Sequence, residues 1–252
     1  MTDRVRRRAL AGLALGVGAS VLAGAVPAPA APPKSGFVKT VEMFEFAPGR
    51  APMRTAVYEP AESDGTKPRA LILALHYGGP LTPETGSEYA ETLVLPAMKG
   101  LGAVVLAPNC PAQGWIDPVS EAAVLALVAS VKKTRRIDER RVAVTGFSMG
   151  AIGAYRLAAR HPDVFGAAIP VAGLPEPEDL EASRGVRLDI IHGEADQVFP
   201  IAQARRAFKA LRKAGADVRV EIVPGLSHYE TAAYVPALKR AAGRLAKAWK
   251  DR

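Results

Sequence analysis

The segment RVAVTGFSMGAIGAYRLAARHP, residues 141–162, joins a strand pattern, a tight turn and a helix pattern. Its first five residues, Arg141–Thr145, form a β-branched run that is typical of a buried strand. The next five residues read G-x-S-x-G around Ser148, and residues 151–160 are rich in Ala and Leu before a His-Pro stop signal. The segment therefore predicts a strand, a sharp turn that carries Ser148, and a helix.

A serine in this local context is a candidate nucleophile. The turn forces the backbone of Ser148 into a strained conformation, which is tolerable only beside small residues, and Gly146 and Gly150 provide that clearance. The turn would lift the hydroxyl away from the sheet and place the next N–H groups at a helix N-terminus, where negative charge is stabilised. Because a G-x-S-x-G string alone is a weak signal, the rest of the chain must supply a base and an acid.

Length and composition limit the classes of protein to consider. The chain has 252 residues and 49% hydrophobic residues, enough for one large α/β domain with a sizeable core. The net charge of +8 comes without a cluster of Lys and Arg interleaved with aromatic residues, so we expect no nucleic-acid partner. Cys110 is the only cysteine, which excludes an internal disulfide.

The N-terminal residues 1–30 have the pattern of an export signal. A basic stretch is followed by an apolar stretch rich in Ala and Gly, and an A-x-A site predicts cleavage before Ala31. Arg6 and Arg7 approximate a twin-arginine motif, but Ala9 stands where that motif prefers a bulkier apolar residue, so the export route stays open.

We therefore expect an exported protein, periplasmic or secreted, with no stable membrane insertion once the signal is removed. Residues 31–36 would form a Pro-rich lead-in without structure, and residues 37–252 would form a single domain.

Strand and helix patterns alternate through the rest of the chain. Strands are expected at residues 37–46, 53–58, 70–76, 103–107, 141–145, 167–171, 187–192 and 218–223, and helices at 84–99, 119–133, 151–160, 200–214 and 231–250. The first two strands would pair antiparallel at one edge. Alternation from residue 70 onward predicts an α/β fold, a doubly wound and mostly parallel sheet with helices on both faces. The connection between residues 171 and 187 is too short for a large cap domain.

Polar residues follow several of the expected strands at their carboxyl ends, which share one edge of such a sheet. Ser148 follows one strand, Asp196 a second and His228 a third. A serine hydroxyl needs a histidine to accept its proton, and the histidine needs a carboxylate to orient it. The chain order Ser, Asp, His is the order found in α/β-hydrolases.

Other residues compete for these roles. Glu194 is the alternative acid, whereas Asp189 and Asp217 are poorly placed relative to their strands. His76 and His192 each close a strand, so a structural role beside the site is expected for both.

The strings GFSMGAIGAYRLAARHPDVFGAAIPVAG, HGEADQVFP and GLSHYE, with APNCPAQGW before them, carry a family resemblance. From about residue 70 the chain resembles serine esterases of the α/β-hydrolase fold, close to the phospholipase/carboxylesterase-like, "predicted peptidase" and dienelactone hydrolase-related groups. The resemblance implies Asp196 as the acid and His228 as the base. Dienelactone hydrolases proper usually carry a cysteine where this chain has Ser148, which counts against that particular activity.

The expected oxyanion hole departs from the common pattern. The strand ends in HYGGP, residues 76–80, which is similar to the segment of prolyl-oligopeptidase relatives in which the tyrosine hydroxyl holds the oxyanion. The N–H of Met149 is one expected donor. The second is either the Tyr77 hydroxyl or an N–H of Tyr77 or Gly78, and the alternative is a Tyr77 that only packs.

These patterns predict a serine hydrolase acting on carboxylic esters, either small molecules or esters borne on a polymer. No metal or organic cofactor is expected, and Trp115 is expected in the wall of an open site. The HYGGP segment leaves a serine peptidase or amidase as an alternative, and a catalytically silent hydrolase fold used for binding is a further one. Acyl length, alcohol group and oligomeric state stay open.

Overall fold

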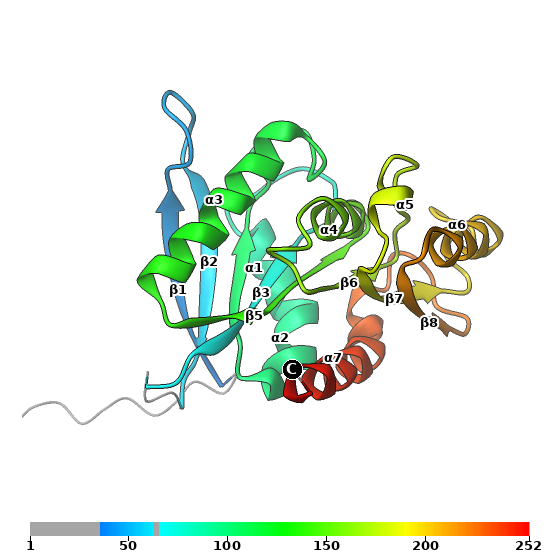
Figure 1. Cartoon of the computed structure of the whole chain (residues 1–252). Coiled ribbons are helices and arrows are strands. Elements are labelled where there is room, and N and C mark those ends of the chain that lie inside the picture. Colours follow the sequence, from blue (N-terminus) through cyan, green and yellow to red (C-terminus); the bar gives the residue numbers. More distant parts are fainter. Residues whose placement is uncertain (1–35, 63–65, 252) are drawn as a thin grey trace, which may run out of the picture. The chain divides into compact units, whose positions relative to one another are not determined.

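The computed structural model describes residues 36–62 and 66–251 (Figure 1). The chain divides into two units, Met1–Ala31 and Pro32–Arg252, and the described residues all belong to the second. The predicted export signal and the predicted lead-in up to residue 35 lie outside the described residues.

One eight-stranded sheet, in the order β1-β2-β4-β3-β5-β6-β7-β8, forms the centre of this unit. β1 pairs antiparallel with β2 and β2 with β4, while β4, β3 and β5 to β8 run parallel, as the sequence predicted. The strands are β1 (Phe37–Phe44), β2 (Met53–Pro60), β3 (Arg69–Leu75), β4 (Val104–Pro108), β5 (Ile137–Phe147), β6 (Ala167–Val171), β7 (Arg187–Gly193) and β8 (Asp217–Val223).

Helices cover both faces of the sheet and form two hydrophobic cores (Figure 1). α3, α4 and α6 pack on one face, and α1, α2 and α7 pack on the other. Alternate residues of β3 enter the two cores, Leu71, Leu73 and Leu75 on one side and Ala70 and Ile72 on the other. The helices are α1 (Thr85–Tyr89), α2 (Leu95–Met98), α3 (Pro118–Thr134), α4 (Met149–Arg160), α5 (Asp179–Ala182), α6 (Ile201–Ala214) and α7 (Val235–Lys250).

The helix expected over residues 84–99 is not continuous. A π-helical turn, Ala90–Val94, separates α1 from α2, and a 3-10 turn follows at Lys99–Leu101. Pro96 stands in the first turn of α2. Because proline has no backbone N–H to donate, the regular hydrogen-bond ladder is interrupted at this point.

The last helix also starts later than expected. A 3-10 turn at Thr231–Tyr234 precedes α7, which has Pro236 in its first turn, where the missing N–H costs nothing. No helix in the described part of the chain is both long and apolar enough to cross a bilayer.

The connection from β6 to β7 contains only the short helix α5, so no cap domain covers this part of the sheet edge. Asp179 of α5 is buried and forms an ion pair of 2.7 Å with Arg156 of α4. Burial raises the pKa of Asp179, although Arg156 and Arg160 act against this. The pair fixes the short connection against the helix that follows Ser148.

Candidate active site

Ser148 occupies the turn between β5 and α4, as the sequence predicted. Its backbone has φ 55° and ψ −115°, a region that side chains with a Cβ rarely adopt. The Ser148 N–H donates a hydrogen bond of 3.0 Å to the carbonyl of Val171 at the end of the neighbouring strand β6. This contact holds the strained residue at the carboxyl edge of the sheet.

Three glycines make room for this turn. A Cβ on Gly146 would overlap the carbonyl of Gly150, and a Cβ on Gly150 would overlap the carbonyl of Leu75 in β3. Gly173 plays a similar part, since a Cβ there would lie 2.8 Å from the Ser148 carbonyl oxygen. Gly146 and Gly150 follow from the motif, whereas Gly173 lies in a different loop and carried no sequence signal.

The structure brings Ser148, His228 and Asp196 into one hydrogen-bonded row. The Ser148 hydroxyl lies 2.9 Å from Nε2 of His228, and Nδ1 of His228 lies 2.9 Å from Oδ2 of Asp196. With Asp196 ionised, Nδ1–H donates to the carboxylate and Nε2 is left to accept from the hydroxyl. His228 and Asp196 are buried, while Ser148 is partly exposed.

Asp196 is held as a carboxylate by its surroundings. Its Oδ1 accepts hydrogen bonds from the N–H groups of Val198 (2.9 Å) and Phe199 (2.7 Å). Burial alone would raise the pKa of Asp196, but the hydrogen bonds from His228 and Phe199 outweigh it and lower the pKa below its ordinary value. The group is therefore charged at neutral pH.

Side chains that the sequence did not single out position the His228 loop. The His228 N–H donates to Oε1 of Gln197 at 3.2 Å, and the Tyr234 hydroxyl donates to the Ser227 carbonyl at 3.1 Å. The ring of Phe199 lies 5.7 Å from that of His228. Gln197 and Phe199 follow Asp196 closely in the same loop. This closeness in sequence was the feature that could have pointed to their role beside His228.

The competing histidines have structural partners, as expected. His76 is buried and accepts a hydrogen bond of 3.0 Å from the Cys110 N–H, and burial lowers its pKa. His192 is also buried; its Nε2–H donates to the Phe199 carbonyl at 2.8 Å, and burial lowers its pKa. Glu194, the alternative acid, accepts from the Gly225 N–H at 3.2 Å.

The expected oxyanion donors belong to two neighbouring segments, the start of α4 and the segment after β3. Met149 opens this helix, whose first N–H groups have no partner within the helix. A Cβ built on Gly78 would lie 3.6 Å from the Met149 side chain, so the segment after β3 runs beside the first turn of α4. The ring of Tyr77 packs edge-on against Tyr89, with ring centroids 6.3 Å apart.

Trp115 is not in the wall of the site, and that prediction is corrected. Its side chain is 1% exposed and lies in the core against Gly153 of α4. The indole Nε1–H donates a hydrogen bond of 2.8 Å to the carbonyl of His76. Through this hydrogen bond Trp115 holds the end of β3 in place. Gly153 leaves the space that the indole ring needs.

Within residues 36–62 and 66–251, no three His, Cys, Asp or Glu side chains are grouped so that they could hold a metal ion.

Comparison with known proteins places the sequence in a family. Residues 115–251 match the Dienelactone hydrolase family. Esterase YpfH of Escherichia coli (strain K12) is 32% identical over 97 residues, which cover 38% of this chain and 42% of that protein. NocK of Nocardia uniformis subsp. tsuyamanensis is 29% identical over 95% of this chain and 76% of its own length. The chain spans about half the length of the first curated relatives that it matches.

Solved structures share the fold. A ferulic acid esterase superposes with a TM-score of 0.66 at 19% sequence identity, covering 84% of this chain and 97% of that one. At this level of identity the likeness establishes the α/β-hydrolase fold and nothing about the substrate.

Proposed function

Because the chain belongs to the dienelactone hydrolase family, we propose that it is an exported serine hydrolase that cleaves carboxylic esters. The observation that carries this proposal is the hydrogen-bonded row of Ser148, His228 and Asp196, with both links at 2.9 Å. Esterase names among the relatives and the structural neighbours support the choice of esters.

In this proposal the Ser148 hydroxyl attacks the acyl carbon while Nε2 of His228 takes its proton. Asp196 accepts the Nδ1–H of His228 and stabilises the imidazolium as it forms. His228 then returns the proton to the leaving alcohol, and an acyl-enzyme remains on Ser148. A water molecule, activated by the same histidine, releases the acid and restores the hydroxyl.

The tetrahedral intermediates carry negative charge on the former carbonyl oxygen. The Met149 N–H at the start of α4 is the first donor for this charge, supported by the helix dipole. For the second donor we favour a backbone N–H of Tyr77 or Gly78, because the Tyr77 ring packs against Tyr89.

An open site favours esters that are short or that project from a larger molecule. Ser148 is partly exposed, and the β6–β7 connection contains only a four-residue helix. Two large exposed side chains, Val198 and Tyr229, follow Asp196 and His228 closely in the chain and provide apolar surface beside the site.

Hydrolysis of p-nitrophenyl acetate, butyrate and octanoate by the purified protein, beside Ser148→Ala, tests the proposal. We expect kcat to fall by about 10⁴-fold or more in the variant, because the nucleophile acts as one unit with its base. Activity should decline from acetate or butyrate to octanoate. An active Ser148→Ala variant would contradict the nucleophile, and a preference for octanoate would contradict the open site. Equal inactivity of both proteins on esters would favour the peptidase alternative if peptide amides are cleaved, and a binding scaffold if they are not.

A further inference from the structure

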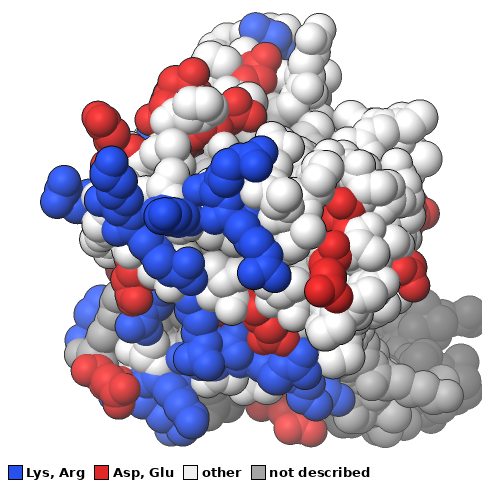
Figure 2. Space-filling view, turned by 90° about the vertical axis from the view of Figure 1, so that its right-hand side faces the viewer, with Lys and Arg blue, Asp and Glu red and all other residues white. Residues whose placement is uncertain are grey.

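Basic side chains are concentrated in the last part of the fold. Residues 201–251 contain eleven Lys or Arg residues and four Asp or Glu residues. Neither α6 nor α7 contains an acidic residue. Figure 2 looks onto the side of the molecule on which α6 and β8 lie, and Lys and Arg side chains are prominent there. The positive net charge of the chain is thus concentrated in one region of the surface.

A cleft of about 830 Å³ lies in this region, between α7 and the first residues of β6, β7 and β8. These strands are parallel, and Ser148 and Asp196 lie beyond their opposite ends. Because a strand rises about 3.3 Å per residue, the seven residues of β7 separate the cleft from the active site by on the order of 20 Å. The cleft is therefore a separate site.

Part of the cleft lining is apolar. Gly243 of α7 faces open space, since no atom lies within 4 Å of the position that its Cβ would take. The missing side chain keeps the cleft open between helix and sheet. On the face of the sheet toward α7, the apolar lining comes from Ala167, Ile169, Leu245 and Ala248.

Some of the charged residues in the lining neutralise one another. Arg244 forms two hydrogen bonds of 2.6 Å with the carboxylate of Asp189. Arg187 pairs with Asp217 at 3.3 Å across the neighbouring strands β7 and β8. In all, five basic and three acidic residues line the cleft.

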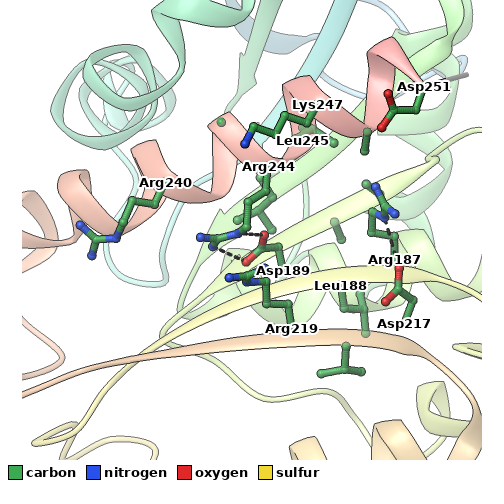
Figure 3. A pocket seen from close by; sticks show the side chains of 16 residues that line it. Arg187, Leu188, Asp189, Asp217, Arg219, Arg240, Arg244, Leu245, Lys247 and Asp251 are labelled. Atoms are coloured by element: carbon green, nitrogen blue, oxygen red, sulfur yellow. Dashed lines mark hydrogen bonds and ion pairs between the residues drawn. The ribbon is translucent and has the colours of Figure 1, made fainter.

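Two cations of the lining form no ion pair within the described part of the chain, although Arg219 stands beside Asp189, the partner of Arg244, in the register of β7 and β8. Among residues 36–62 and 66–251, no ion pair or hydrogen bond engages the side chain of Arg219 or of Lys247. Both residues are exposed. Figure 3 shows that they come from opposite walls, Arg219 from strand β8 and Lys247 from helix α7. A guanidinium and an ammonium group thus face a cleft with apolar surface between them.

We propose that this cleft binds an amphipathic organic anion, a molecule with an apolar body and one carboxylate, phosphate or sulfate group. The apolar body would contact the lining that includes Ile169 and Leu245, and the anionic group would contact Arg219 and Lys247. Guanidinium and ammonium groups both bind such oxygens through charge-assisted hydrogen bonds. The net positive charge of α6 and α7 raises the local concentration of anions. This inference does not depend on the proposed esterase activity.

Titration calorimetry of the purified protein with octyl phosphate, below its micelle concentration, tests the proposal. Octyl glucoside and inorganic phosphate are the matched probes, because each keeps one half of the ligand. We expect octyl phosphate to bind at least 10-fold more tightly than either. Arg219→Gln and Lys247→Gln should each weaken its binding by about 10-fold, the value of one hydrogen bond to a charged group.

Gly243→Leu tests the cleft itself without changing any charge. The leucine side chain would fill the space beside the helix, and we expect octyl phosphate binding to fall by more than 10-fold. Leucine is a better helix former than glycine, so α7 should be retained, which a thermal melt would check. Lys209→Gln is the matched control, because it removes an exposed cation from α6 outside the cleft lining and should leave the affinity within 2-fold.

Vesicles containing phosphatidylglycerol distinguish a lipid source of the anion from a free one. Binding to these vesicles that Gly243→Leu removes would identify a lipid as the ligand, and failure to bind them beside tight binding of octyl phosphate would identify a free anion. The proposal is overturned if octyl phosphate does not bind, if octyl glucoside or inorganic phosphate binds equally well, or if Gly243→Leu has no effect on either ligand. An equal loss of affinity in Lys209→Gln and Lys247→Gln would likewise overturn the proposal, because binding would then depend on general surface charge and not on the cleft.

Discussion

At the scale of single residues, two buried histidines make the stability of the fold depend on pH. His76 and His192 are fully buried, and burial lowers the pKa of each from its ordinary value of 6.5. Between their folded pKa values and 6.5 the unfolded chain binds protons that the folded chain excludes. The free energy of unfolding should therefore fall as pH drops below 6.5, by up to about 1.4 kcal/mol per pH unit for each histidine.

Urea unfolding at several pH values between 7 and 5 measures this slope. The range stays above the pKa of most carboxyl groups, so the histidines dominate it. His192→Gln should be less stable at pH 7, because the hydrogen bond to Phe199 changes, and should show a shallower slope. An unchanged slope would mean that His192 takes up protons equally well in the folded and the unfolded protein.

The three candidate catalytic residues could be predicted from the sequence, whereas the position of Trp115 could not. Ser148 follows β5 directly, and Asp196 and His228 lie in the loops just after β7 and β8, so the topology brings all three to one edge. Trp115 lies in a loop, and its burial depends on a glycine in a distant helix, Gly153, that leaves space for the indole. Local patterns carry no information about such a contact.

At the scale of elements, replacement of a glycine by alanine should destabilise the fold in helix α4 and stabilise it in helix α7. Gly150→Ala would place a Cβ against the Leu75 carbonyl, which is backbone and cannot move aside, so α4 could no longer pack on β3. We expect it to cost about 3 kcal/mol or more. Gly243→Ala meets no atom within 4 Å and should stabilise α7 by about 0.5–1 kcal/mol.

Chemical denaturation of both variants measures the two changes in free energy. Gly150→Ala should also lose ester hydrolysis, since Ser148 stands two residues before it. A fully stable and active Gly150→Ala variant would contradict the close packing of the turn.

The order and type of the main elements could be predicted, but several boundaries could not. The continuous apolar run of a strand such as β3 and the glycines of the turn are local signals. The break within residues 84–99 arises from Pro96, which ordinarily marks a helix start, and the π-helical turn before it packs against α7 and the 3-10 turn that precedes α7. The cleft could not be predicted from the sequence either, because Arg219 and Lys247 are brought to the same cleft only when the chain folds.

At the scale of the whole molecule, we propose that the first 30 residues direct export and are then removed. The basic start, the apolar stretch and the A-x-A site support this. Expression in an exporting bacterial host should yield a mature chain that begins at Ala31, as N-terminal mass analysis would show. Replacing Arg6 and Arg7 by lysine should retain the precursor in the cell if the twin-arginine route is used. A folded product outside the cell that still carries residues 1–30 would contradict cleavage.

The central claim is that His228 and Asp196 activate Ser148 as a nucleophile, and covalent labelling tests it most directly. The folded protein would be treated with a fluorophosphonate, and the modified peptide would be identified by mass spectrometry. We predict one adduct per chain on Ser148, none on Ser148→Ala, and labelling that is slower by orders of magnitude in His228→Ala. No adduct on the folded wild-type protein, or an adduct on a different residue, would contradict the account.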